Sequence, residues 1–239
     1  MPCYKIDPAM LTHDRCTVTG ATATHLLTVL RKHCGETLAL TDGAGMHWSG
    51  MIVEKRKRTL TIQITATMRT SRPGPDITVA AAVLPQDRWR YVMEKCVELG
   101  AGTIIPLLTA RTQRRKSHVG KQAHWQGIAD QAAEQSGRLW WPTVAPLTDW
   151  QRLISTCGAY DYRLCARPEL PATRLAYAIP AGRVLILIGP EGGLTADEIR
   201  ATEYAGVFPL YLGPLTLRAE TAAVVALTTV QLSQWQGGV

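Results

Sequence analysis

An apolar run that ends in a glycine loop is the feature that most constrains this chain. Residues 183–188 read Arg-Val-Leu-Ile-Leu-Ile, and the segment Gly-Pro-Glu-Gly-Gly follows at 189–193. Aliphatic residues without polar alternation suit a strand that is buried on both faces of a parallel sheet. The spacing of Thr195 and Glu198, which come next, is typical of a capped helix start. The sequence therefore predicts a strand, a glycine loop and a helix, as in an α/β fold.

The glycine loop taken alone is compatible with ligand binding and with a plain turn. Glycines let a ligand approach the main chain without meeting Cβ atoms, but pairs of glycines also mark ordinary turns. No Lys follows the glycines as in a phosphate-binding loop, and the spacing differs from the dinucleotide fingerprint GxGxxG. Both interpretations stay open at this point, while the missing fingerprint argues against a Rossmann dehydrogenase.

A second Gly-Pro loop follows about twenty residues later. A short apolar strand is expected at residues 207–212, and the segment Gly-Pro-Leu-Thr-Leu-Arg-Ala-Glu-Thr-Ala at 213–222 opens the last helix. Ligands of open α/β sheets bind outside the carboxyl ends of the strands. We therefore expect the two loops to form opposite walls of one pocket.

The residues before position 70 indicate a separate small domain. Short strands joined by polar turns favour a barrel or a sandwich, with strands expected at residues 16–19, 37–42, 47–54 and 60–66 and a helix at 21–32. Pro and Gly at residues 69–76 mark a domain boundary. Beyond it a βαβ unit predicts a parallel sheet, with its elements at 77–84, 88–99 and 103–108. Further helices are expected at 121–137 and 149–156, and a strand at 160–165.

The two loop segments resemble the cofactor region of the SPOUT methyltransferases, and specifically of the RsmE family. Further matching pieces occur in the order of that family along most of the chain, namely His-Leu-Leu-Thr-Val-Leu-Arg at 25–31, Asp-Gly at 42–43, Glu-Lys-Cys-Val-Glu-Leu-Gly at 94–100 and Glu-Gln-Ser-Gly-Arg at 134–138. The resemblance implies a PUA-like RNA-binding β-barrel over residues 1–70. It implies for residues 77–239 a SPOUT domain, an α/β fold with a parallel sheet and a C-terminal trefoil knot. Knots are nearly absent among folds, so the knot rests on the resemblance alone.

The resemblance also implies an enzyme that methylates N3 of a uridine in 16S ribosomal RNA of the small subunit, at uridine 1498, with S-adenosylmethionine as cofactor. Family members are homodimers. The cofactor-binding residues that it implies are Leu187, Ile188, Gly189, Pro190, Glu191, Gly192, Gly193, Leu212, Gly213 and Leu217. Two rival functions stay open, namely ribose 2′-O methylation by a related SPOUT enzyme and RNA binding without catalysis.

Arg218 and Glu220 are the candidate catalytic residues. The N3 atom of uracil carries a proton, so the reaction needs a proton acceptor and a cation that stabilises the charge spread over O2 and O4. We assign the stabilising cation to Arg218 and the proton acceptor to Glu220 or a water that it holds. In the alternative interpretation Glu220 only stabilises the helix start by its negative charge.

The formal charge of +7 lies in the first half of the chain. Residues 1–70 carry +4 and residues 71–121 carry +5, whereas the remainder carries −2. An uneven basic charge of this kind is typical of a protein that binds a polyanion. The candidate RNA-binding residues are Lys5, Arg15, Arg31, Lys32, Arg111, Arg114, Arg115, Lys116 and Arg138. Solubility is the open alternative for the basic segment 111–116. The basic turn 55–58 is most simply a solvated hairpin tip, with a phosphate contact as the alternative.

Several classes of protein are disfavoured by composition. No apolar run reaches the length of a membrane span, and the first residues lack the layout of a secretory signal. We therefore expect a cytoplasmic protein without a membrane partner. The six Cys and six His include no CxxC or HExxH pattern, so no metal site is expected and the thiols are expected to be reduced. Trp140 and Trp141 are expected in a core or a dimer interface, with base stacking as the alternative.

Overall fold

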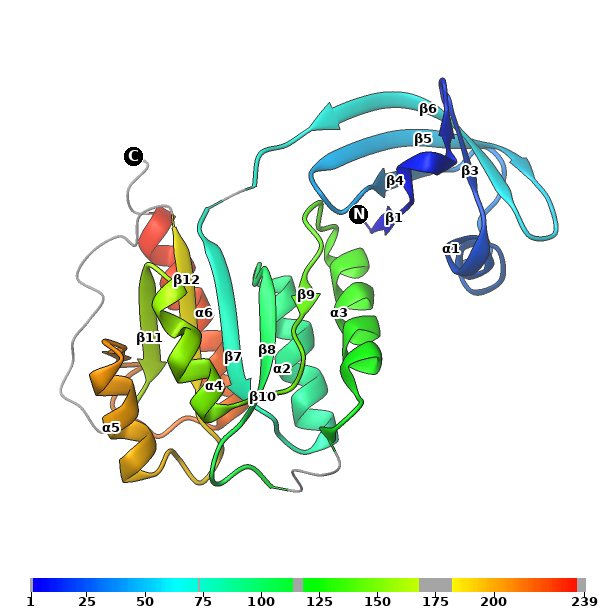
Figure 1. Cartoon of the computed structure of the whole chain (residues 1–239). Helices are drawn as coiled ribbons and strands as arrows, with labels where there is room; N and C mark the ends of the chain where they lie inside the picture. The colour runs from blue at the N-terminus through cyan, green and yellow to red at the C-terminus, as the bar shows by residue number, and fades with distance from the viewer. Residues whose placement is uncertain (1, 73, 114–117, 168–181, 236–239) are drawn as a thin grey trace. The chain divides into compact units, whose positions relative to one another are not determined.

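The computed structural model describes residues 2–72, 74–113, 118–167 and 182–235, and their side chains up to residue 233. The chain divides into two compact units. The N-terminal unit contains residues 1–73 together with 133–141, and the C-terminal unit contains residues 74–132 and 142–239. Figure 1 shows the elements of each unit.

The N-terminal unit is built on one mixed sheet. Its strands lie in the order β1 (Cys3–Lys5), β4 (Thr37–Thr41), β5 (Met46–Lys55), β6 (Leu60–Arg69), β3 (Arg15–Val18) and β2 (Leu11–Thr12). The four strands expected from the sequence are confirmed within a few residues. The strands β1 and β2 were not expected, because two or three residues are too few to show an alternating pattern. The apolar side chains of the sheet form one core around Leu40, Ile52 and Ile62.

The helix predicted at residues 21–32 is shorter and changes its geometry. It begins as α1 (Gly20–Thr24) and continues as a π-helical turn over His25–Val29. The hydroxyl of Thr28 donates to the carbonyl of Thr24, so this helix carbonyl accepts a hydrogen bond from a side chain. Arg31 then has a φ of 49°, which ends the helical path before Lys32.

The segment 133–141 belongs to the N-terminal unit although it lies far along the chain. The amide of Trp141 donates to the carbonyl of Gly43 at 2.9 Å, and the amide of Gly45 donates to Leu139 at 3.1 Å. A Cβ atom on Gly45 would come within 2.6 Å of the Trp140 ring, so only glycine allows this approach. Lys5 places its ammonium 5.6 Å from the ring centre of Trp141. Both Trp residues therefore pack within this unit.

The C-terminal unit is a parallel α/β sheet, as the sequence predicts. In the described part of the chain its strands follow the order β10 (Thr148–Asp149), β8 (Thr103–Leu108), β7 (Asp76–Ala82), β12 (Arg183–Ile188), β11 (Tyr162–Ala166) and β13 (Phe208–Leu210), with β9 (Thr143–Val144) beside β8. All pairings are parallel. The helices are α2 (Gln86–Glu98), α3 (Gln122–Ser136), which continues into the N-terminal unit, α4 (Trp150–Thr156), α5 (Ala196–Tyr204) and α6 (Ala219–Trp235).

The strand β12 is buried on both faces, which explains its unbroken apolar sequence. Leu185 and Leu187 share a core with Trp150 and Leu153 of α4. Ile186 and Ile188 are also buried and alternate to the opposite face, where α6 packs against β12, β7 and α2. In Figure 1, α4 lies in front of this sheet and α6 behind it.

The loops after β12 and β13 are brought to one edge of the sheet. β12 and β13 follow each other in the chain, but β11 lies between them in the sheet. The parallel direction of all three strands places their carboxyl ends together, which is where ligands of such sheets bind. Among the described residues, no helix is both long enough and apolar enough to span a membrane.

Candidate active site

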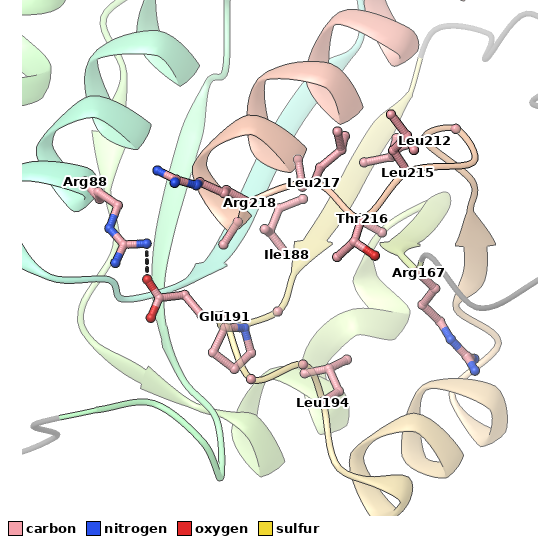
Figure 2. A pocket seen from close by; sticks show the side chains of 18 of the residues that line it. Arg88, Arg167, Ile188, Glu191, Leu194, Leu212, Leu215, Thr216, Leu217 and Arg218 are labelled. Atoms are coloured by element: carbon pink, nitrogen blue, oxygen red, sulfur yellow. Dashed lines mark ion pairs between the residues drawn. The ribbon is translucent and has the colours of Figure 1, made fainter.

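Both glycine loops line one cavity of about 940 Å³ in the C-terminal unit. Its wall contains residues 188–194 of the first loop and residues 212, 213, 215–219 and 222 of the second loop and helix α6. Figure 2 shows the side chains of these two walls on either side of the cavity. Cavities of 300 to 1,000 Å³, roughly, are of the size that small-molecule cofactors occupy. The expectation that the two loops form one pocket is therefore confirmed.

The first loop is held by hydrogen bonds from its own helix start. Gly193 adopts a φ of 71°, and its amide donates to the carbonyl of Pro190 at 2.9 Å. The predicted capping box is present, because Thr195 accepts from the amide of Glu198 while the Glu198 carboxylate accepts from the amide of Thr195. This reciprocal pair fixes the direction in which the chain leaves the loop.

The loop that follows β8 also anchors the first glycine loop. Arg111 donates from Nη1 to the carbonyl of Gly192 at 2.5 Å. The amide of Ala110 donates to Oε1 of Glu198 at 2.7 Å. Glu198 is only 6% exposed, so the bond from Ala110 is partly shielded from water, whereas the bond from Arg111 is exposed. The first glycine loop is consequently fixed by contacts from two neighbouring segments.

The second loop presents leucine side chains to the cavity. Leu212, Leu215 and Leu217 line the cavity, and Leu215 is 75% exposed. Gly213 has a φ of 122°, a conformation that residues with a Cβ atom rarely adopt. Apart from its chain neighbours, no atom of the described residues lies within 4 Å of the position of a Cβ atom there. At this position the backbone conformation itself therefore favours glycine.

Charged side chains gather at one end of the cavity. Arg88 of α2 forms an ion pair with Glu191 of the first loop, drawn as a dashed line in Figure 2. The same Nη1 atom of Arg88 lies 3.8 Å from Oε2 of Glu220. The Glu220 side chain is 12% exposed, and its Oε2 atom has no hydrogen-bond partner within the described residues. Arg218 lines the same cavity, so two cations and two carboxylates lie at this site.

Arg167 supplies a further cation to the cavity wall. It directly follows β11, its side chain is 11% exposed, and its Nη1 atom lies 3.1 Å from Oε1 of Glu203 in α5. No motif around Arg88 or Arg167 pointed to the site. The one available signal for Arg167 was its position just after a predicted strand, at the edge where ligands bind.

Nearly all predicted cofactor residues lie on the cavity. Leu187 differs, because its side chain is 1% exposed and packs in the core that the sheet shares with α4. Glu220 is buried beside Arg88, which lines the cavity. Cavity residues outside the two loop segments that the sequence singled out are Arg88, Ala166, Arg167, Leu194 and Ile199.

The predicted RNA-binding residues have different surroundings. Lys5, Arg15, Arg31 and Arg111 are exposed, whereas Lys32 forms an ion pair with Glu36 at 2.6 Å. Arg114, Arg115 and Lys116 lie outside the described residues.

Arg138 is half-buried in the N-terminal unit. Its Nε atom donates to the carbonyl of Trp140 at 3.0 Å. Burial, and second the charge of Arg72, lower the pKa of Arg138 to about 10. The basic turn at 55–58 joins β5 to β6, as expected for a hairpin tip.

Comparison with known proteins places this site in a family. A family model described as an RNA methyltransferase domain matches residues 71–231. The protein from Synechocystis sp. named Ribosomal RNA small subunit methyltransferase E is 34% identical over 231 residues, which cover 94% of this chain and 75% of that protein. The chain belongs to the RsmE family of RNA methyltransferases. The Bacillus subtilis protein of the same name is 30% identical, over a match that covers 89% of this chain and 88% of that protein.

Two solved structures share the fold of this chain. A putative methyltransferase from Legionella pneumophila, solved in complex with the bound cofactor SAM, has a TM-score of 0.86 at 29% identity. A Ribosomal RNA small subunit methyltransferase E from Neisseria gonorrhoeae, bound to S-adenosyl methionine, has a TM-score of 0.86 at 26% identity. Each match covers 97% of this chain and 97% of the solved chain. The resemblance that the motifs indicated is thereby confirmed.

Proposed function

We propose that this chain methylates N3 of a uridine in small-subunit ribosomal RNA, at the position equivalent to uridine 1498, with S-adenosylmethionine as methyl donor. The observation that carries the proposal is the single cavity on which two glycine loops meet a cluster of Arg and Glu side chains. The names of the relatives support an RNA methyltransferase of the small subunit. The two structures solved with SAM support the cofactor.

The residues of the cavity fit S-adenosylmethionine. Leu212, Leu215 and Leu217 offer apolar surface to an adenine ring, and the glycine loops offer main-chain groups for its polar edge. We assign the cofactor contacts to the residues that the family resemblance implies, from Ile188 to Gly193 and at Leu212, Gly213 and Leu217, with Leu187 supporting them from the core. When bound, S-adenosylmethionine supplies a methyl group on a positively charged sulfur.

Arg218 and Glu220 supply the remaining chemistry in this proposal. The proton of N3 has to leave before the nitrogen becomes a nucleophile, and the Glu220 carboxylate accepts it directly or through a water. Its Oε2 atom is buried and has no hydrogen-bond partner in the described part of the chain, so it has capacity to accept. Arg218 stabilises the negative charge on the uracil oxygens. The target base has to be unstacked, because Watson-Crick pairing covers N3.

The remaining parts of the protein are assigned by the same family resemblance. We propose that residues 1–70 form a PUA-like barrel that binds RNA, and that residues 77–239 form a knotted SPOUT domain. RNA contacts are assigned to Lys5, Arg15, Arg31, Lys32, Arg111, Arg114, Arg115, Lys116 and Arg138. We also propose a homodimer, and sedimentation as a monomer at micromolar concentration would contradict it.

The experiment that tests the function combines cofactor binding with product analysis. The protein is incubated with labelled S-adenosylmethionine and either small subunits or naked 16S RNA from cells that lack this activity. Mass spectrometry of the nuclease-digested product should find one 3-methyluridine. A methylated ribose would support 2′-O methylation instead, and absence of cofactor binding in calorimetry would leave an RNA-binding protein without catalysis.

The assignment of the proton acceptor has its own test. Glu220→Gln keeps the size of the side chain but removes the carboxylate, so we expect the methylation rate to fall by about 100-fold or more, in the range for general bases. If Glu220→Gln retains the full rate across the pH range, Glu220 has only the role of a negative charge at the start of α6.

A further inference from the structure

We infer that Arg88 is a positioning residue that ties the two glycine loops together at the charged end of the cavity. This inference rests on the proposed methyl transfer. Arg88 extends from α2, an element that neither loop motif includes. It reaches Glu191 of the first loop and Glu220 at the start of α6 with one guanidinium.

The surroundings of Arg88 suit a bridging role. Its side chain is 40% exposed and lines the cavity, whereas the Glu220 side chain is 12% exposed. Glu191 is 32% exposed and is paired with Arg88. The guanidinium is planar and carries five donors, so it can serve two carboxylates that approach from different directions. A Lys ammonium is a compact charge on a flexible stem and holds such a geometry less well.

The cations on the elements that pack against α6 do not take the place of Arg88 beside Glu220. Helix α6 packs against α2, β7 and β12. The ionisable residues of β7 and β12 are Asp76 and Arg183, which pair in register at the beginning of the strands, the end opposite the loops. On α2, Arg90 is paired with Glu94, and Lys95 is paired with Glu98.

The second loop adds one more cation near Glu220. Arg218 precedes Glu220 by two residues, lines the cavity and is exposed. No ion pair joins Arg218 to Glu220 among the described residues, whereas Arg88 lies 3.8 Å from Glu220. Arg218 is therefore available to the substrate, and Arg88 is the cation that faces Glu220 in the protein itself.

This division of roles predicts a specific kinetic signature. Without Arg88 the carboxylate of Glu220 loses the cation that lies 3.8 Å from its Oε2 atom, and with it a contact that fixes its position. Small displacements of a reacting group lower kcat strongly, so we expect Arg88→Gln to lower kcat by about 10- to 100-fold. The KM for the RNA should change by less than about threefold, because Arg88 contacts Glu191 and Glu220 rather than a phosphate group. Arg88→Lys should recover part of kcat.

A double-mutant cycle in cofactor binding isolates the contact between Arg88 and Glu191. The dissociation constant of S-adenosylmethionine is measured by calorimetry without RNA for wild type, Arg88→Gln, Glu191→Gln and the double variant. Each single change should raise it by about two- to fivefold, as for a partly exposed ion pair. The double variant should be no weaker than the weaker single variant, because both changes remove the same contact.

Arg90→Gln is the matched control. Arg90 lies on the same helix, is 57% exposed and pairs with Glu94, so its replacement should leave kcat and cofactor affinity unchanged. The inference would be overturned if Arg88→Gln had the same kcat as wild type. It would also be overturned if the loss of cofactor affinity in the double variant equalled the product of the losses in the two single variants. Where Arg88→Gln does not fold, Arg88→Lys carries the comparison of kcat and Glu191→Gln carries the comparison of cofactor affinity. A wild-type chain that binds the cofactor but methylates no RNA would overturn the proposed function, while the binding cycle would still report on the Arg88 contact.

Discussion

The two glycine loops line one cavity but are stabilised in different ways. The first loop is held by Arg111, by the capping box of α5 and by Glu198, which is bonded to the loop after β8. The second loop has a glycine at a φ of 122° and an exposed leucine at 215. The first loop thus offers a fixed main chain, and the second offers side chains, Arg218 among them. The two walls of the cavity therefore differ in what they present, although residues of both loops line it.

The largest difference between the loops should appear in the methylation rate. Arg218→Ala removes the proposed stabilising cation of the second loop, and we expect kcat to fall by about 100- to 1,000-fold, as when one such group is removed from other enzymes. Glu191→Gln in the first loop should change cofactor affinity more than kcat. Single-turnover methylation assays measure both. An unchanged rate for Arg218→Ala would show that the second loop carries no chemistry.

The anchoring of the first loop should appear in stability. In wild type the amide of Ala110 donates to Oε1 of Glu198 and the amide of Thr195 donates to Oε2. Glu198→Gln replaces one of these oxygens by an NH₂ group, which cannot accept a hydrogen bond. We expect a loss of about 2 kcal/mol in the free energy of unfolding, because a buried donor loses its partner. Urea denaturation measures this value.

Asp197→Asn is the control for Glu198. The Asp197 side chain is 86% exposed and pairs with Arg200 at the surface. Its replacement should change the free energy of unfolding by less than about 1 kcal/mol. Equal losses for the two variants would show that Glu198 does not anchor the loop.

Glycine replacements distinguish backbone geometry from packing. Gly213→Ala places a Cβ atom in a strained conformation, at a cost of about 1 kcal/mol or more, although the space around it is open. Gly192→Ala places its Cβ atom 3.4 Å from Cδ of Arg111, an ordinary contact without backbone strain. Calorimetry should therefore show about a fivefold or greater loss of cofactor affinity for Gly213→Ala. A larger loss for Gly192→Ala would reverse this order.

The smallest effect is expected from the contact between Arg111 and the first loop. Arg111→Met removes the hydrogen bond to the Gly192 carbonyl, and we expect cofactor affinity to fall by about two- to fivefold. Arg152→Met, an exposed position on α4, is the control. If only the KM for RNA rises, Arg111 acts on RNA, as the sequence suggested, and not on the loop.

Local signals account for the parts of the fold that the sequence predicted well. β12 matches residues 183–188 because its burial on both faces leaves an unbroken apolar run. The start of α5 follows from the capping box, whose two residues are three positions apart. In contrast, the sequence predicted only that residues 213–222 open the last helix, and the structure places the start of α6 at Ala219.

Long-range contacts explain what the sequence did not predict. The segment 133–141 joins the N-terminal unit by backbone bonds to the turn at Gly43 and Gly45, and no local pattern encodes such a pairing. Arg88 and Arg167 belong to the cavity because α2 and β11 meet the loops in space. Neither residue lies in a glycine motif.

The sequence alone determined the two glycine loops, the parallel α/β architecture and the candidate pair Arg218 and Glu220. Each of these depends on residue type and on spacings of a few positions, which act within one turn or strand. Only the tertiary structure decided that both loops line one cavity, that Arg111 anchors the first loop and that Arg88 faces Glu191 and Glu220. Those facts depend on which strands and helices become neighbours, because contacts across a sheet join residues that the chain keeps about a hundred positions apart.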